Sequence, residues 1–208
     1  MSSNTTGPII QVKNHLIKLL QDYYGEKEPT YEFKWTNDIR TTKIVIADKY
    51  AINLGSIGQM PAIRANLGPK NLSSKTLGQN TDIDYRTTTT KYLVLYESTV
   101  IFQCVCVLGA QSERLAHETW EVFLYYGWDW MQMIPYIHHV TNIAIGEEQL
   151  IDADSNTKRI GIPVQVSVVM QHAWSYTKEG PLLKEIEILP PESPEEHQEP
   201  SEGDEGSE

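Results

Sequence analysis

Residues 160–176, IGIPVQVSVVMQHAWSY, restrict the fold of this chain more than any other segment. Apolar or aromatic side chains stand at most alternate positions from Ile162 to Tyr176, and the positions between them hold mainly Gln and Ser. Because neighbouring side chains of a strand point to opposite faces, this alternation predicts one strand with an apolar face and a polar, uncharged face. Ordinary strands have about 5–6 residues, so we expect a strand that is too long for its own core.

The length and apolar content predict one soluble domain. The chain has 208 residues, of which 40% are hydrophobic. No apolar run approaches the roughly 20 residues that cross a bilayer, and the N-terminal MSSNTTGPII lacks the pattern of a signal peptide. We therefore expect a cytoplasmic protein without a membrane-spanning segment.

The formal net charge of −11 is concentrated at the C-terminus. Residues 190–208 hold eight acidic residues and no Lys or Arg, whereas the rest of the chain has 20 acidic and 17 basic residues. The near-neutral body argues against a dedicated nucleic-acid-binding protein. We expect residues 1–189 to form the domain and residues 190–208 to be a disordered acidic tail, because they are too polar to bury.

The apolar pattern predicts an α+β fold in a single domain, with two main helices and an antiparallel-dominated sheet. One helix is expected at residues 8–24, and the other is expected to begin at Ser112 as its N-cap and to end at Gly127. The segment 53–84 is expected to be a long polar loop or an extended β-arm, apart from a strand at its PAIRANL stretch. The expected strands cover residues 30–36, 42–48, 61–67, 85–97, 100–108, 136–145, 160–176 and 182–188, with a hairpin turn at residues 98–99.

One segment has the spacing of a calcium loop. Asp152, Asp154 and Asn156 stand at the first, third and fifth positions of such a loop. Thr157 and Pro163 occupy the positions where the motif requires Gly and Glu. A polar hairpin turn is the better interpretation.

Histidine and cysteine residues form no complete ligand set in the sequence. His138 and His139 are adjacent, so in a strand they are expected to point to opposite faces, where they cannot hold one metal together. His172 is interpreted as a core or interface histidine. Cys104 and Cys106 are expected to be reduced core thiols on one face of a strand, since a disulfide between them would be strained.

No catalytic motif is recognisable. His117 and Glu118 lie in the second predicted helix without a nucleophile, and the chain lacks nucleophile-elbow, Walker and zinc-protease motifs. The prediction is a protein that is not an enzyme, with no catalytic, cofactor-binding or metal-binding residue.

Aromatic residues gather after the start of the second predicted helix, where they allow two interpretations. They could pack in the core, or they could form a surface for a partner protein. The cluster comprises Trp120, Tyr125, Tyr126, Trp128, Trp130 and Tyr136.

The order of elements over residues 8–188 resembles the tail terminator proteins in the necks of tailed bacteriophages. The closing strand, IPVQVSVVMQHAWSY, comes nearest to a shared pattern, whereas the segment 53–84 and the acidic tail are not part of it. The resemblance implies a structural virion protein that forms a homo-oligomeric ring between the tail tube and the head connector. Its partners would be the tail-tube protein and the head-completion or connector protein, with DNA only passing through the lumen.

This resemblance supplies no site residues. It places the protein in the neck or tail of the virion, assembled in the host cytoplasm and away from membranes. The alternatives within the same class are a head-completion adaptor and a tail-tube subunit. A small cytoplasmic enzyme of unknown reaction is the alternative from a different class.

Overall fold

The computed structural model describes residues 8–52, 57–72, 80–84, 89–127, 129, 134, 137–153, 157–177 and 187–189. The elements in chain order are α1 (Pro8–Glu26), β1 (Val45–Asp48), the single 3-10 turn η1 (Lys49–Ala51), β2 (Ala62–Leu72), β3 (Asn80–Asp84), β4 (Thr89–Cys106), α2 (Gly109–Tyr125), β5 (Ile137–Ile145), β6 (Gln149–Ala153), β7 (Thr157–Thr177) and β8 (Glu187–Leu189).

The described strands form one sheet of eight strands in the order β1-β2-β4-β7-β5. β3 pairs with β4 beyond the end of β2, and β6 and β8 pair with β7 on either side of β5. Only the β1–β2 pair is parallel. The prediction of an α+β domain with two helices and an antiparallel-dominated sheet is therefore confirmed.

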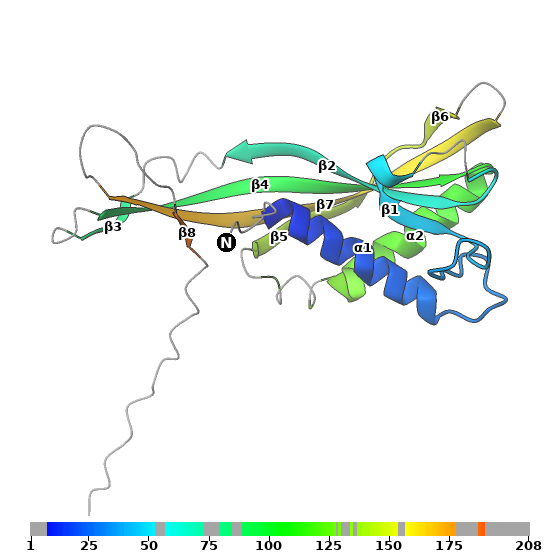
Figure 1. The fold of residues 1–208 in the computed structure, drawn as a ribbon. Helices are drawn as coiled ribbons and strands as arrows, with labels where there is room; N and C mark the ends of the chain where they lie inside the picture. Colours follow the sequence, from blue (N-terminus) through cyan, green and yellow to red (C-terminus); the bar gives the residue numbers. More distant parts are fainter. Residues whose placement is uncertain are drawn as a thin grey trace, which may run out of the picture.

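Both helices lie on the same side of the sheet (Figure 1). The first helix, α1, is present as predicted, and it buries an apolar stripe at Ile9, Val12, Leu16 and Leu20 that packs with the buried face of α2. Alternate residues of β4 and β7 complete this core, because every second side chain faces the helices. These strand residues are Tyr96, Val100, Phe102, Cys104, Cys106, Ile162, Val164, Val166, Val168 and Met170.

A second, smaller apolar cluster lies on the other face of the sheet, at one end. Ile52, Ala62 and Val105 are buried there, with Ile57 and Ile151 packed against them. Ile52 and Ile57, which follow η1, therefore cover the face opposite the helices only at this end of the sheet.

β4 and β7 are the longest strands and form one continuous ladder. They pair without a register shift from Cys106 opposite Ile160 to Thr89 opposite Thr177. The expected hairpin turn at residues 98–99 is therefore wrong. Ser98 and Thr99 stand inside β4, where each pairs with a residue of β7 and no Gly or Pro interrupts the strand.

Two further sequence predictions fail locally. The segment 30–36 forms turns instead of a strand: the Tyr31 amide donates to the Glu28 carbonyl, and the Trp35 amide donates to the Tyr24 carbonyl. α2 begins at Gly109, so Ser112 is not its N-cap. The Ser112 hydroxyl instead accepts from the Cys106 amide and donates to the Ile160 carbonyl, which ties α2 to the sheet.

Most other expected elements are present, with different ends. The segment 53–84 holds an extended β structure, since β2 continues to Leu72 with a bulge next to Pro69, and β3 follows. The β6 strand was not expected from the sequence. The last predicted strand is described only as β8, and the predicted acidic tail, residues 190–208, lies outside the described residues.

Candidate interaction surface

The sheet face that turns away from the helices is the most extensive candidate surface. Its side chains come from alternate positions of the three central strands and are all partly exposed. We call this surface the open face. It comprises Arg64, Asn66, Leu95, Glu97, Thr99, Ile101, Gln103, Gln165, Ser167, Val169 and Gln171.

The open face is nearly free of charge. Only Arg64 and Glu97 among its residues are ionisable, and amide, hydroxyl and aliphatic groups make up the rest. The hydroxyl oxygens of Thr99 and Ser167 lie 2.9 Å apart across the ladder. Thr141 of β5 reaches onto the same face, where its hydroxyl is 2.9 Å from Glu97 Oε1. The face thus offers hydrogen-bonding groups without the hydration that charges demand, a composition that suits protein contacts.

One end of the open face is hollowed into a depression of about 220 Å³. We call it the Arg64 groove, and it lies beside the smaller apolar cluster, to which Ile52 after η1 and Ile151 of β6 belong. It is lined by Lys49, Arg64, Asn66, Ile101, Gln103, Gln149, Pro163 and Gln165. Among the described residues, the lining has two cations and four carboxamides but no carboxylate.

Arg64 lacks a counter-charge among the described residues. Its Nε is buried without a hydrogen-bond partner, and burial lowers the pKa of the guanidinium. The guanidinium of Arg159 lies nearby and is almost fully buried. Burial is the main cause that lowers its pKa as well. Arg159 Nη1 donates to the Met60 carbonyl at 3.4 Å. The Arg64 guanidinium therefore adds a positive charge to this end of the sheet that no described carboxylate pairs with.

The β4–β7 ladder extends beyond both helices (Figure 1). Tyr96 and Met170 face each other in the ladder and belong to the core. From there the two strands continue to Thr89 and Thr177, and at about 3.3 Å per residue this adds roughly 20 Å. β3 and β8 flank this part, which we call the arm. Its backbone is described, and the predicted overlong strand is confirmed.

A polar cluster joins the two helices and the loop after α1. Tyr31 donates to Glu118 Oε2 at 2.5 Å, Tyr23 donates to Glu118 Oε1 at 3.2 Å, and Lys27 pairs with Glu118 at 3.3 Å. Burial, followed by the hydrogen bond to Glu118, raises the pKa of Tyr31 above its ordinary range. The sequence did not point to this cluster, because its members are far apart in the chain. His117, the neighbour of Glu118, is exposed. Each polar group of the cluster is engaged with another, which is the arrangement of a structural contact.

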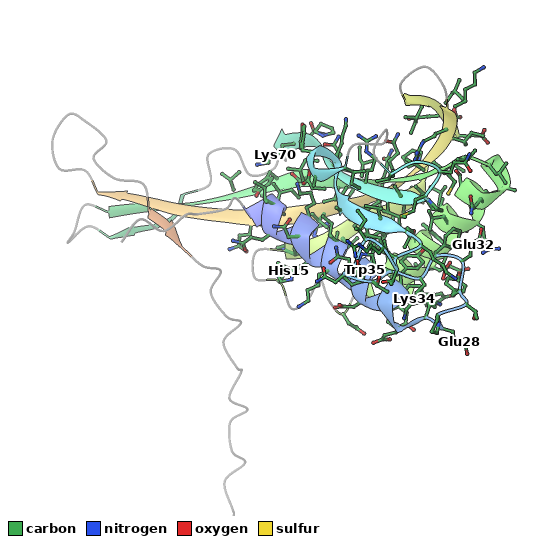
Figure 2. All side chains as sticks on the ribbon, turned by 45° about the vertical axis from the view of Figure 1, so that its right-hand side comes forward. His15, Glu28, Glu32, Lys34, Trp35 and Lys70 are labelled. Atoms are coloured by element: carbon green, nitrogen blue, oxygen red, sulfur yellow. The ribbon has the colours of Figure 1, made fainter. Side chains whose placement is uncertain are left out.

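A hollow of about 680 Å³ lies next to this cluster, at the C-terminal end of α1. Leu19, Tyr23, Trp35 and Tyr126 supply its apolar lining, and Asp22, Glu26 and Lys27 contribute charges. Figure 2 shows Trp35 and Lys34 beside this end of α1, with Glu28 and Glu32 on the loop that follows the helix, whereas Lys70 lies far away on β2.

The aromatic cluster is divided between core and surface. Trp120 is partly buried and its Nε1 donates to the Ile143 carbonyl at 3.2 Å. Tyr125 is 69% exposed and Tyr126 is 54% exposed, so neither belongs to the buried face of the second helix. The helix ends at Tyr125, where the regular spacing of its buried face stops. Trp128, Trp130 and Tyr136 lie outside the described residues.

His138 and His139 do not point to opposite faces, contrary to the prediction. Both side chains are exposed, and their Nδ1 atoms lie 2.9 Å apart. The cause is a bulge in β5, where the register with β7 shifts between Ile137 and His139 and breaks the regular alternation. In the part of the chain that the structure describes, no third His, Cys, Asp or Glu joins them in a group that could hold a metal ion.

The remaining candidate residues stay apart from one another. Asp152 pairs in the backbone with Lys158 between β6 and β7, as a hairpin requires, and residues 154–156 lie outside the described ranges. For His172 only the backbone is described, opposite Val94. Cys104 and Cys106 are free, buried thiols on the helix side of β4, which confirms their prediction as reduced core residues.

Neither described helix is long and apolar enough to cross a membrane. A scan of the chain against protein-family models finds no match, and no curated protein matches it either.

Proposed function

We propose that this chain is a ring-forming structural subunit of a tailed-bacteriophage neck, a tail terminator that joins the tail tube to the head connector. The observation that carries the proposal is the β4–β7 ladder, which continues past the helix-covered core to Thr89 and Thr177. A strand pair that leaves its own core exposes two faces that a neighbouring subunit can cover.

The size of the arm supports this assignment. In the arm, β4 and β7 each run for roughly 20 Å and are flanked by the shorter β3 and β8, so at about 4.8 Å between strands the arm presents roughly 350 Å² on each face, by projection. Two covered faces approach the roughly 800 Å² that each partner buries in a standard interface. A ring needs two different complementary surfaces on every subunit, and the arm and the part of the open face behind the helix-covered core can serve as these two surfaces.

The near absence of charge on the open face also supports a protein partner. Around Thr99 and Ser167 the face offers hydroxyl and amide groups that can form hydrogen bonds across an interface. DNA would only pass through the lumen of the ring, since the body of the chain is near neutral.

Deletion of the gene from the producing genome tests the role. Tails of abnormal length, or tails detached from heads, are the expected particles in electron micrographs. Unfilled or leaking heads would instead indicate the head-completion adaptor, and absent tail tubes would indicate the tail-tube subunit. Normal, fully joined particles would overturn the structural role altogether.

A further inference from the structure

The described lining of the Arg64 groove contains cationic side chains and no acidic side chain. Lys49 and Arg64 form no ion pair with another described residue, and Arg64 Nε lies buried without a hydrogen-bond partner. Asn66, Gln103 and Gln165 line the same groove, and their carboxamides can donate further hydrogen bonds. A carboxylate is the ligand that this arrangement fits best, because arginine binds carboxylates through paired, charge-assisted hydrogen bonds.

The carboxylates of this chain are concentrated after its last described strand. Residues 190–208 carry eight of the 28 acidic residues and no Lys or Arg that could neutralise them internally. They are Glu192, Glu195, Glu196, Glu199, Glu202, Asp204, Glu205 and Glu208. Their local concentration near the groove is high because they belong to the same chain.

The tail is also long enough to reach the groove. β8 pairs Ile188 with Trp174 of β7, and Gln165 of the groove stands nine residues further along the same strand. At about 3.3 Å per residue this separation is roughly 30 Å. The 19 residues from 190 to 208 can span about 60 Å when extended.

We propose that the acidic segment 190–208 binds in the Arg64 groove of its own chain. Tail carboxylates pair there with Arg64 and Lys49, and the segment covers the hollowed end of the open face in the free subunit. A partner that uses the open face must then displace the tail. The bound tail therefore competes with any other protein for this end of the open face. The binding itself does not depend on the neck role.

Carboxyl-to-amine crosslinking of the full-length protein tests this docking. At low ionic strength, a carbodiimide is expected to join tail carboxylates to Lys49 in preference to Lys18 and Lys43, which are exposed lysines outside the groove. Salt should suppress the product, because exposed charge pairs are screened beyond about 10 Å at 0.1 M. Mixing isotope-labelled and unlabelled protein separates crosslinks within one chain from crosslinks between chains.

Two variants with the same change in net charge make the test specific. Arg64→Gln should reduce the Lys49 crosslink by about fivefold, while Arg40→Gln, at an exposed loop position, should leave it unchanged. Gln165→Glu, which places a carboxylate in the groove, should also reduce it and serves if Arg64→Gln fails to fold. Equal crosslinking of all three lysines, no effect of Arg64→Gln and Gln165→Glu, or crosslinks only between chains would overturn the proposal. If crosslinking shows the tail in the groove but deletion of the gene leaves normal particles, only the neck role is rejected.

Discussion

The hydroxyl oxygens of Thr99 and Ser167 lie 2.9 Å apart across the β4–β7 ladder, on the sheet face that neither helix covers. The next residue, Val168, is fully buried beneath the helices. One step along β7 thus changes a side chain from a core position to an accessible one, because side chains alternate between faces.

Val168→Ala should therefore lower the free energy of unfolding by about 2 kcal/mol, through lost apolar burial and the cavity left behind. Ser167→Ala should lower it by less than about 1 kcal/mol, since Thr99 can still hydrogen-bond to water. Urea unfolding of the two variants measures both values. Equal losses would contradict the assignment of the two faces.

The ion pair between Lys13 of α1 and Asp48 of β1 should make stability depend on pH. Burial would raise the pKa of Asp48, but hydrogen bonds from Lys13 and the Tyr50 amide bring it below its ordinary value. A depressed carboxyl pKa contributes stability that is present above the unfolded-state pKa and is lost as the pH falls through the folded-state pKa. Asp48→Asn should cost about 1–3 kcal/mol at neutral pH and flatten the acid limb of the stability curve.

Urea unfolding at neutral and acidic pH measures that effect. Asp22→Asn, which makes the same change of charge at an exposed position of α1, is the matched control and should behave like the unchanged protein. An Asp48→Asn curve as steep as that of the control would disprove the linkage.

Gly161 should not tolerate a side chain. A Cβ at this position would collide with Ile151 Cδ1 and lie 3.4 Å from Gln103 Cγ, at the edge of the smaller apolar cluster. Gly161→Ala should destabilise the protein by about 1–3 kcal/mol through overpacking. At Gly109 the nearest atom would be Ile160 Cδ1 at 3.4 Å, and alanine favours the helix that begins there. Gly109→Ala should be neutral or stabilising, and thermal unfolding compares the two.

Replacement of Glu118 should change the ionisation of Tyr31. Burial first, and then the hydrogen bond and the negative charge of Glu118, raise the pKa of that phenol. Glu118→Gln removes the charge, so Tyr31 should ionise at a lower pH than in the unchanged protein. The absorbance of tyrosinate, recorded with Tyr31→Phe to identify the band, follows this shift. Glu121→Gln, at an exposed position of the same helix, should leave the titration unaltered.

The two thiols should be inert in the folded protein. Burial raises the pKa of Cys104 to about 12 and that of Cys106 to about 11, so neither forms the reactive thiolate near neutral pH. Neither thiol should react with a disulfide reagent until denaturant unfolds the chain, when both should react. Rapid labelling of one thiol under native conditions would show that this part of the sheet opens.

The sequence was most informative where a feature depends only on periodicity. The alternation after residue 160 correctly predicted a long strand with one apolar face, and the stripe from Ile9 to Leu20 predicted the first helix. Both patterns arise because one face of each element is buried, and burial of one face requires apolar residues at a regular spacing in the sequence. The same alternation correctly predicted that the opposite face of β7 is polar and uncharged.

Tertiary pairing decided the features that local residues leave open. Ser98 and Thr99 looked like a turn but lie within β4, because β7 provides backbone partners on one side and β2 on the other. Tyr31, Phe33 and Trp35 alternate as in a strand, yet none of the described strands pairs with them.

The two polar sites also required the folded chain. Glu118 meets Tyr31 across 87 positions of sequence, and Arg64 and Lys49 line one groove because β1 pairs with β2, with Asp48 opposite Ala65. The bulge in β5 that brings His138 to His139 is likewise a property of its pairing with β7. Local patterns thus determined which side chains are buried, and long-range backbone pairing determined which residues meet, since contacts between distant segments leave no periodic trace in the sequence.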